Sequence, residues 1–149
     1  MKQLLLKTIA CAAVLLPLSS QAGNFPKGTT FTRTVTEKVS SKAVGFKIFK
    51  KVPVPAGIPD LKVGDKVKFT IGPKGQLQIK KHDVSIPFKE DGGSANVYVI
   101  PPSRTKPNGD IGEVFKDSTG KPTGVALSFF KTKLSGFTAT TNTVVYTLE

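Results

Sequence analysis

Residues 28–39, GTTFTRTVTEKV, alternate strictly between two kinds of side chain. Threonines occupy every second position, at Thr30, Thr32, Thr34 and Thr36. The positions between them carry larger side chains: Phe31, Arg33, Val35, Glu37 and Val39. Because successive side chains of an extended chain point to opposite faces, the pattern predicts one β-strand with a threonine face and a partly apolar face.

The same two-residue period returns along the rest of the chain. KVKFTI (66–71) and QLQIK (76–80) flank the turn GPKG (72–75), which indicates a hairpin. EVFKDSTGKPTGVALSFF (113–130) indicates a second hairpin that turns through residues 118–122, and further strands are predicted within SANVYVI (94–100) and GFTATTNTVVYTL (136–148). We find no stretch of helical periodicity, and Gly and Pro break the chain at short intervals. The sequence therefore predicts an all-β sandwich or barrel.

Residues 1–22 have the features of a secretory signal peptide. Lys2 and Lys7 precede an apolar run at 8–18, and the small residues at 20–22 form a cleavage site. The apolar run is shorter than the roughly 20 residues that span a bilayer, so we expect no membrane anchor. We therefore expect export through the periplasm.

Export would change the composition of the chain. Cleavage after Ala22 would leave 127 of the 149 residues, which is enough for one domain. It would remove the single cysteine, Cys11, so that no disulfide is expected. It would also remove two of the 22 basic residues and leave 20 against 10 acidic ones, a net charge of about +10. A field of this sign attracts anionic surfaces such as polysaccharide, nucleic acid or lipid headgroups, although it also serves solubility alone.

The order of these segments resembles that of chaperone–usher fimbrial subunits (pilins), especially the cysteine-free adhesive type. A short leader, GNFPK (23–27), precedes the threonine-rich strand, and the chain ends in KLSGFTATTNTVVYTLE (133–149). VGDKVKFTIGPKGQLQIKKHDVSIPF (63–88) is similar to the middle of such pilins. The resemblance implies an immunoglobulin-like sandwich that is incomplete and is completed by donor-strand exchange, in which a neighbouring copy adds its N-terminal extension.

On this resemblance, residues 23–40 are the donor-strand extension and residues 41–149 are the pilin-like domain. The residues implied at the subunit interface are Phe31, Arg33, Val35, Glu37 and Val39. Arg33 departs from the apolar pattern of the family, because a buried charge is costly unless it is paired. The other interpretation of residues 28–39 is an ordinary first strand of a complete domain.

The implied function is that of a structural and adhesive subunit of a fimbrium on the cell surface. Its implied partners are other copies of itself in a filament, a periplasmic chaperone and an outer-membrane usher. A small periplasmic inhibitor or accessory protein is a further interpretation.

The main alternative is a monomeric exported β-domain that binds polyanions such as anionic glycans. Within FKIFKK (46–51), Lys47, Phe49 and Lys51 are expected on one strand face, where the ring can stack on a sugar while the amines meet sulfate or phosphate. A solvated strand face is the simpler explanation of the same pattern. Four lysines would extend the patch if their strands are neighbours: Lys66, Lys68, Lys80 and Lys81. Nucleic acid is not an expected partner of an exported chain.

We expect no enzymatic activity and no metal or cofactor. His82 is the only histidine, and in a strand it and Asp83 would point to opposite faces, which suits no catalytic pair. A zinc site lacks ligands once Cys11 is removed. Glu90 and Asp91 lie in a Gly-rich turn, where solvated carboxylates are more typical than the paired carboxylates of a glycosidase.

Overall fold

The computed structural model describes residues 25–89, 95–104 and 109–149, and the expected signal peptide lies outside them. These residues are all-β, which confirms the predicted class. The strands are β1 (Thr30–Val44), β2 (Lys47–Lys50), β3 (Lys66–Ile71), β4 (Leu77–Ile79), β5 (Val84–Ile86), β6 (Phe88–Lys89), β7 (Ala95–Ile100), β8 (Asp110–Lys116), β9 (Pro122–Ser135) and β10 (Thr138–Leu148), and the short 3-10 helix η1 (Lys80–His82) separates β4 from β5.

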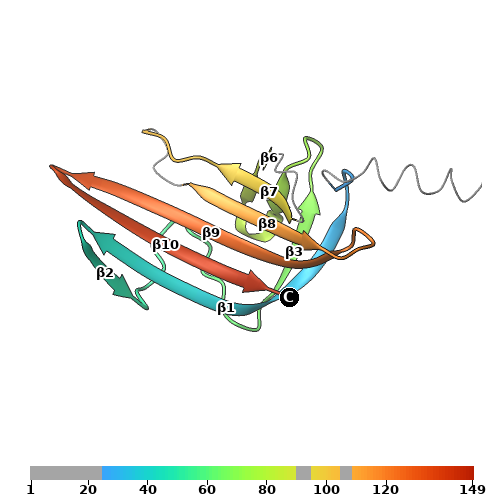
Figure 1. The fold of residues 1–149 in the computed structure, drawn as a ribbon, viewed down its shortest axis with the longest axis horizontal. Coiled ribbons are helices and arrows are strands. Elements are labelled where there is room, and N and C mark those ends of the chain that lie inside the picture. Colours follow the sequence, from blue (N-terminus) through green and yellow to red (C-terminus); the bar gives the residue numbers. More distant parts are fainter. Residues whose placement is uncertain (1–24, 90–94, 105–108) are drawn as a thin grey trace, which may run out of the picture.

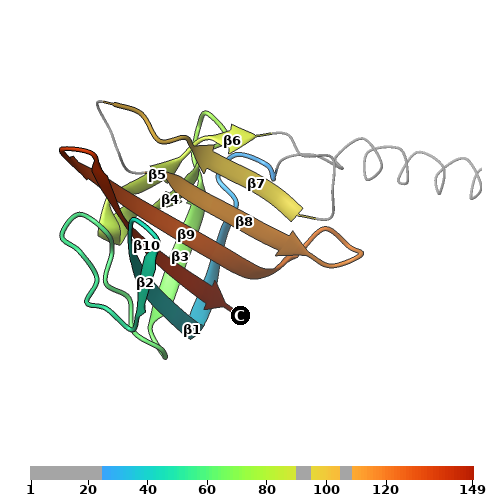
Figure 2. The same cartoon turned by 60° about the vertical axis from the view of Figure 1, so that its left-hand side comes forward.

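All neighbouring strands are antiparallel, in the order β5-β4-β3-β1-β10-β9-β8-β7-β6, and β2 pairs with β1 beside this path (Figure 1). The hairpins predicted to turn at residues 72–75 and 118–122 are confirmed as β3–β4 and β8–β9. The sheet curls until β5 lies against β7 and β8, so that it is nearly closed (Figure 2).

β1 connects two arms of this sheet. Its first part, residues 30–34, pairs with β3 and belongs to a short arm with β4 and β5. Its second part, residues 35–44, pairs with β10 and belongs to a long arm with β9, β8, β7 and β6. A bulge between Val35 and Glu37 separates the two parts. Since a bulge bends a strand and lets it pass from one layer to another, the sheet turns at this point.

The threonine-striped strand is therefore part of the chain's own sheet. β1 runs without a break through residues 40 and 41, where the donor-strand extension was expected to end. Thr34 and Glu149 exchange backbone hydrogen bonds of 2.7 and 2.9 Å, which joins the start of the strand to the end of the chain. The immunoglobulin-like arrangement and donor-strand exchange remain predictions.

The bulge also splits the side-chain face that was expected on this strand. Val35 is 1% exposed, and the Phe31 ring stacks on Phe69 with 5.2 Å between centroids. Beyond the bulge the alternation is reversed, because one extra residue moves every later side chain to the other face. Val39 is accordingly 48% exposed, and Glu37 is exposed as well. Within this chain's own sheet, the five residues expected at an interface do not share one face.

The guanidinium group of Arg33 lies at the rim of the sheet. Its guanidinium lies 5.6 Å from the centre of the Phe31 ring and donates hydrogen bonds to the carbonyl oxygens of Pro122 and Thr123 at the start of β9. The sequence raised the problem of a charged residue on an apolar face. Backbone acceptors from β9 solve it, because they satisfy the charged group without burying it deeply.

The core fills the space inside the curl. Its largest fully buried side chains come from both arms: Tyr98, Tyr146, Phe69, Phe129, Leu61, Ile71, Leu77, Ile79, Ile86, Leu127, Leu148 and Val35. The Tyr146 hydroxyl donates to the Pro59 carbonyl oxygen at 2.6 Å and accepts from the Leu61 amide at 3.1 Å. These two bonds fasten the connection between β2 and β3 to the inner face of the long arm.

Replacing Val35 by Ala should lower the free energy of unfolding by about 2 kcal/mol, because two buried methyl groups are lost and a cavity remains. Val39→Ala makes the same chemical change on the same strand beyond the bulge, and it should cost less than about 0.5 kcal/mol. Urea denaturation of both variants measures the difference. Equal losses would contradict the reversal of faces at the bulge.

Candidate anion-binding surfaces

A pocket of 440 Å³ on the short arm is lined by four lysines and the single histidine. Lys66 and Lys68 come from β3, and Lys80, Lys81 and His82 form η1. The hydroxyl-bearing residues Thr30 and Thr70 also line it. We call this site the lysine pocket.

The alternation of β3 explains why these lysines face outward. Val67, Phe69 and Ile71 are buried, which leaves Lys66, Lys68 and Thr70 on the outer face. Directly opposite residues of an antiparallel pair share a face, and β1 places Thr34, Thr32 and Thr30 opposite these three positions. The threonine stripe of β1 therefore lies beside the lysine stripe of β3.

η1 supplies the remaining basic groups because the chain turns back after β4. The turn ends at Asp83, whose φ of 54° is left-handed and leads the chain into β5. Lys66, Lys68, Lys80 and Lys81 do lie together, since all four line one pocket, but this pocket does not include the patch that they were to extend. Sequence reasoning missed the contribution of His82 and of the threonines. For His82 the available signal was its position directly after Lys80 and Lys81 in the sequence.

The lysine pocket is suited to an anionic group. In the part of the chain that the structure describes, no carboxylate lines the pocket, so the positive charges of its lysines are not neutralised there. Ammonium groups held close together repel one another, and an anion between them removes that repulsion. Threonine hydroxyls add neutral donors and acceptors for sulfate, carboxylate or sugar hydroxyl groups.

The other predicted contact, Lys47, Phe49 and Lys51, lies elsewhere. β2 pairs with residues 41–44 of β1, whereas β3, which carries Lys66 and Lys68, pairs with residues 30–34 (Figure 1). Lys47 and Phe49 share a face of β2, but Lys51 follows the strand with a φ of 56° and leaves its alternation. The structure thus places these residues and the lysine pocket on two separate surfaces.

A second pocket, of 640 Å³, lies where the curl of the sheet stays open. Its lining includes His82, Asp83, Ser85, Asp110 and Phe129. Burial raises the pKa of the Asp110 carboxyl above its ordinary value. His82 and Asp83 both reach this pocket, contrary to the expectation of opposite faces, because a 3-10 turn and not a strand carries His82. A single half-buried carboxyl does not identify a ligand, and the absence of enzymatic activity remains a prediction.

Within residues 25–89, 95–104 and 109–149, no group of three or more His, Cys, Asp or Glu side chains could hold a metal ion. In the same ranges, no helix has the length and apolar character needed to cross a membrane. No family model, curated protein or solved structure matches this chain.

Proposed function

We propose that this chain is an exported, monomeric β-domain that binds anionic polysaccharide through the lysine pocket and so mediates attachment to surfaces. The observation that carries the proposal is the convergence of four lysines, a histidine and two threonines on one concave site. The sequence distributes these residues over β1, β3 and η1. Their convergence is expected if all of these side chains contact the same anionic ligand.

The ligand that suits this site is a sugar polymer with sulfate or carboxylate groups. Lys66, Lys68, Lys80 and Lys81 are exposed, so their ammonium groups remain hydrated and available to a ligand that arrives from solvent. Thr30 and Thr70 are a directly opposed pair and offer two hydroxyls on the same face. Contacts of this kind are individually weak and sensitive to salt, so affinity depends on several of them acting together.

The position of β1 supports the monomeric part of the proposal. Residues 30–34 complete the short arm of their own chain, and Phe31 within them and Val35 directly after them face the core. A domain that already uses this strand has no need of a neighbour's strand to cover the same apolar surface.

Changing Lys66, Lys68, Lys80 and Lys81 to Gln together should weaken binding to immobilised heparin about 30-fold or more at low salt. Wild-type affinity should fall steeply as salt is added, because the contacts are screened. Affinity measured by surface plasmon resonance over a salt series tests both expectations.

A charge-matched control separates the pocket from net charge. Lys27, Lys62, Lys74 and Lys121 are exposed and lie outside the pocket lining, and their joint replacement by Gln removes the same charge. This variant should lose less than about threefold in affinity. Equal losses in the two quadruple variants would reduce the effect to net charge and reject the pocket.

Donor-strand exchange into a fimbrial filament is a second candidate, and one observation favours it. Residues 30–33 pair with β3 along one edge, while the pairing of β1 with β10 begins at Val35. A segment that is paired along one edge is easier to replace by the same segment of another copy. In that case the immunoglobulin-like, incomplete domain of the pilin resemblance would apply, with chaperone and usher as partners.

Protein exported by cells that express the full chain should sediment as a monomer and show no filaments in electron microscopy. Analytical ultracentrifugation over a range of concentrations provides the mass. Filaments that disappear when residues 23–39 are deleted would reject the monomeric domain in favour of donor-strand exchange.

A further inference from the structure

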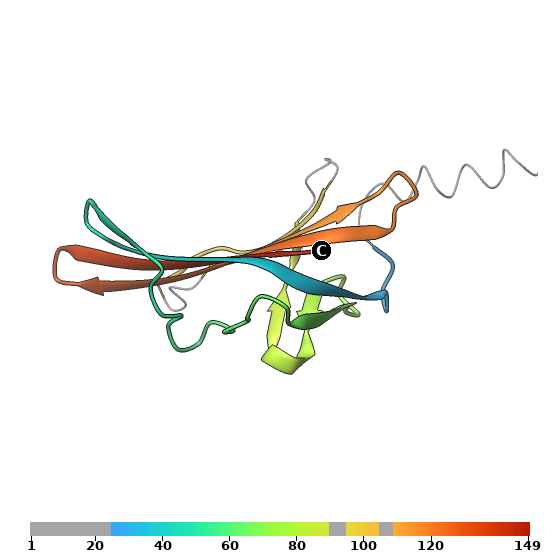
Figure 3. The same cartoon turned by 90° about the horizontal axis from the view of Figure 1, so that it is seen from below.

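Beyond the core, four strands of the long arm continue in the order β2-β1-β10-β9. Figure 3 shows their two hairpins projecting past the rest of the sheet. We call these two hairpins, residues 41–51 and 130–143, the hairpin extension. Gly45, at the tip of the first hairpin, donates a backbone hydrogen bond of 3.4 Å to Ala139 beside the tip of the second. The two tips therefore lie next to each other.

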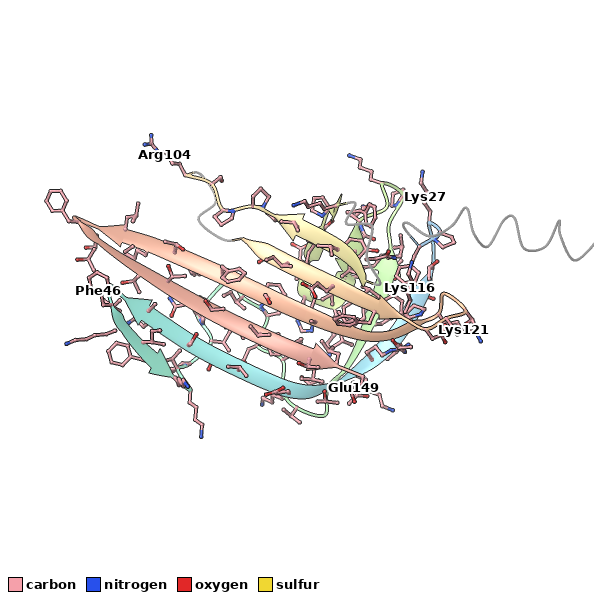
Figure 4. All side chains as sticks on the ribbon, viewed as in Figure 1. Lys27, Phe46, Arg104, Lys116, Lys121 and Glu149 are labelled. Atoms are coloured by element: carbon pink, nitrogen blue, oxygen red, sulfur yellow. The ribbon has the colours of Figure 1, made fainter. Side chains whose placement is uncertain are left out.

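Both hairpins end in the same two residues. Gly45-Phe46 joins Val44 to Lys47, and Gly136-Phe137 joins Ser135 to Thr138. The glycines have φ values of 55° and 58°, as the turn of a two-residue hairpin requires. The phenylalanines are fully exposed, at 106% and 112%, and Figure 4 shows Phe46 at the end of the β1–β2 hairpin. Neither ring contributes to the core, so folding does not explain their place at the tips.

The strand register places four of the six lysines of the extension on one face. Cross-strand neighbours share a face, and two adjacent rows cross all four strands on the side that continues the inner face of the sheet. These rows are Lys47, Val44, Thr140, Lys133 and Phe49, Lys42, Asn142, Lys131. The inner face of the sheet thus changes from apolar in the core to basic in the extension.

The opposite face of the extension carries threonines and apolar side chains, and Lys50 is its one lysine. One of its rows is Ile48, Ala43, Thr141, Thr132, and beside it Ala139 lies opposite Leu134. Ile48 and Leu134 are exposed, as are both tip rings. Among the described residues, five of the eight exposed large hydrophobic side chains belong to the extension: Phe46, Ile48, Phe49, Leu134 and Phe137.

The charge of the extension has one sign. Residues 41–51 and 130–143 contain six lysines and no aspartate or glutamate. Against a second copy, this surface would bring six lysines toward six others. Like charges at such a contact repel, which disfavours self-association through this face.

We propose that the hairpin extension docks on an anionic lipid bilayer and that Phe46 and Phe137 enter the interface between headgroups and acyl chains. Aromatic rings are favoured at that depth, and lysines near the surface are attracted to anionic headgroups. A fluid interface accepts two protruding rings without a preformed pocket. This surface is separate from the lysine pocket, so the inference does not rest on polysaccharide binding.

The double variant Phe46→Ser/Phe137→Ser should bind vesicles of mixed phosphatidylcholine and phosphatidylglycerol at least about tenfold more weakly than wild type. Val63→Ser, an exposed apolar residue outside the extension, should bind as wild type does. Changing Lys42 and Lys133 to Gln should lower affinity by about fivefold per lysine. All variants are made in the full-length chain, so any N-terminal contribution is common to them, and vesicle co-sedimentation measures binding.

A fluorescence experiment reports insertion directly, because the chain contains no tryptophan. Phe46→Trp and Phe137→Trp each introduce a single fluorophore at a tip. We expect their emission to shift to the blue with the anionic vesicles and to stay unchanged with phosphatidylcholine alone. Phe115→Trp, on β8 outside the extension, should show no shift.

Binding without a blue shift at either tip would overturn the proposal and leave a purely electrostatic contact. Failure to bind the anionic vesicles would overturn it as well.

Heparin binding of the same variants distinguishes the membrane proposal from the polysaccharide proposal. The tip variant should keep its heparin affinity, whereas the quadruple lysine-pocket variant should keep its vesicle affinity. A tip variant that loses heparin and vesicles equally would mean that one anion-binding surface serves both and that the tips have no lipid-specific role.

Discussion

The bulge between Val35 and Glu37 is the constraint on which the rest of this structure depends. It bends β1, passes the strand from the short arm to the long arm and lets the sheet curl around its core. Before the bulge, Phe31 and Val35 face the core and the threonines face outward. After it the faces are exchanged, so that Ser40 is buried and Val39 is exposed. One additional residue thus determines what each half of the strand presents to solvent.

The two candidate surfaces follow from the two halves of β1. The first half lies beside β3 and contributes Thr30 to the lysine pocket. The second half leads away from the core into the hairpin extension, with its basic and apolar faces and phenylalanine tips. Both surfaces are basic, but one is concave while the other projects and carries exposed rings. The buried side chains inside the curl supply most of the stability of the fold.

The threonine stripe shows why a strand pattern alone cannot assign a function. Alternation records that one face of a strand is apolar and the other polar. It is the same whether the strand completes its own sheet or that of a neighbour, since both give it an apolar and a solvated side. The resemblance to pilins rested on such patterns. In the structure the stripe forms part of the outer face beside Lys66 and Lys68, a role that needs no second copy.

The sequence by itself determined the all-β class, the hairpin between β3 and β4, the outward direction of Lys66 and Lys68, and the excess of positive charge, because two-residue periodicity and composition are local properties. Tertiary structure alone decided the rest. The bulge reversed the face of Val39, the return of the chain after β4 brought Lys80 and Lys81 to β3, and the register of four strands collected lysines on one face and Ile48 and Leu134 on the other. These features depend on which strands are neighbours and on their register. Pairing between segments that are far apart in the chain does not change the alternation of side chains within either segment, so the sequence pattern does not reveal it.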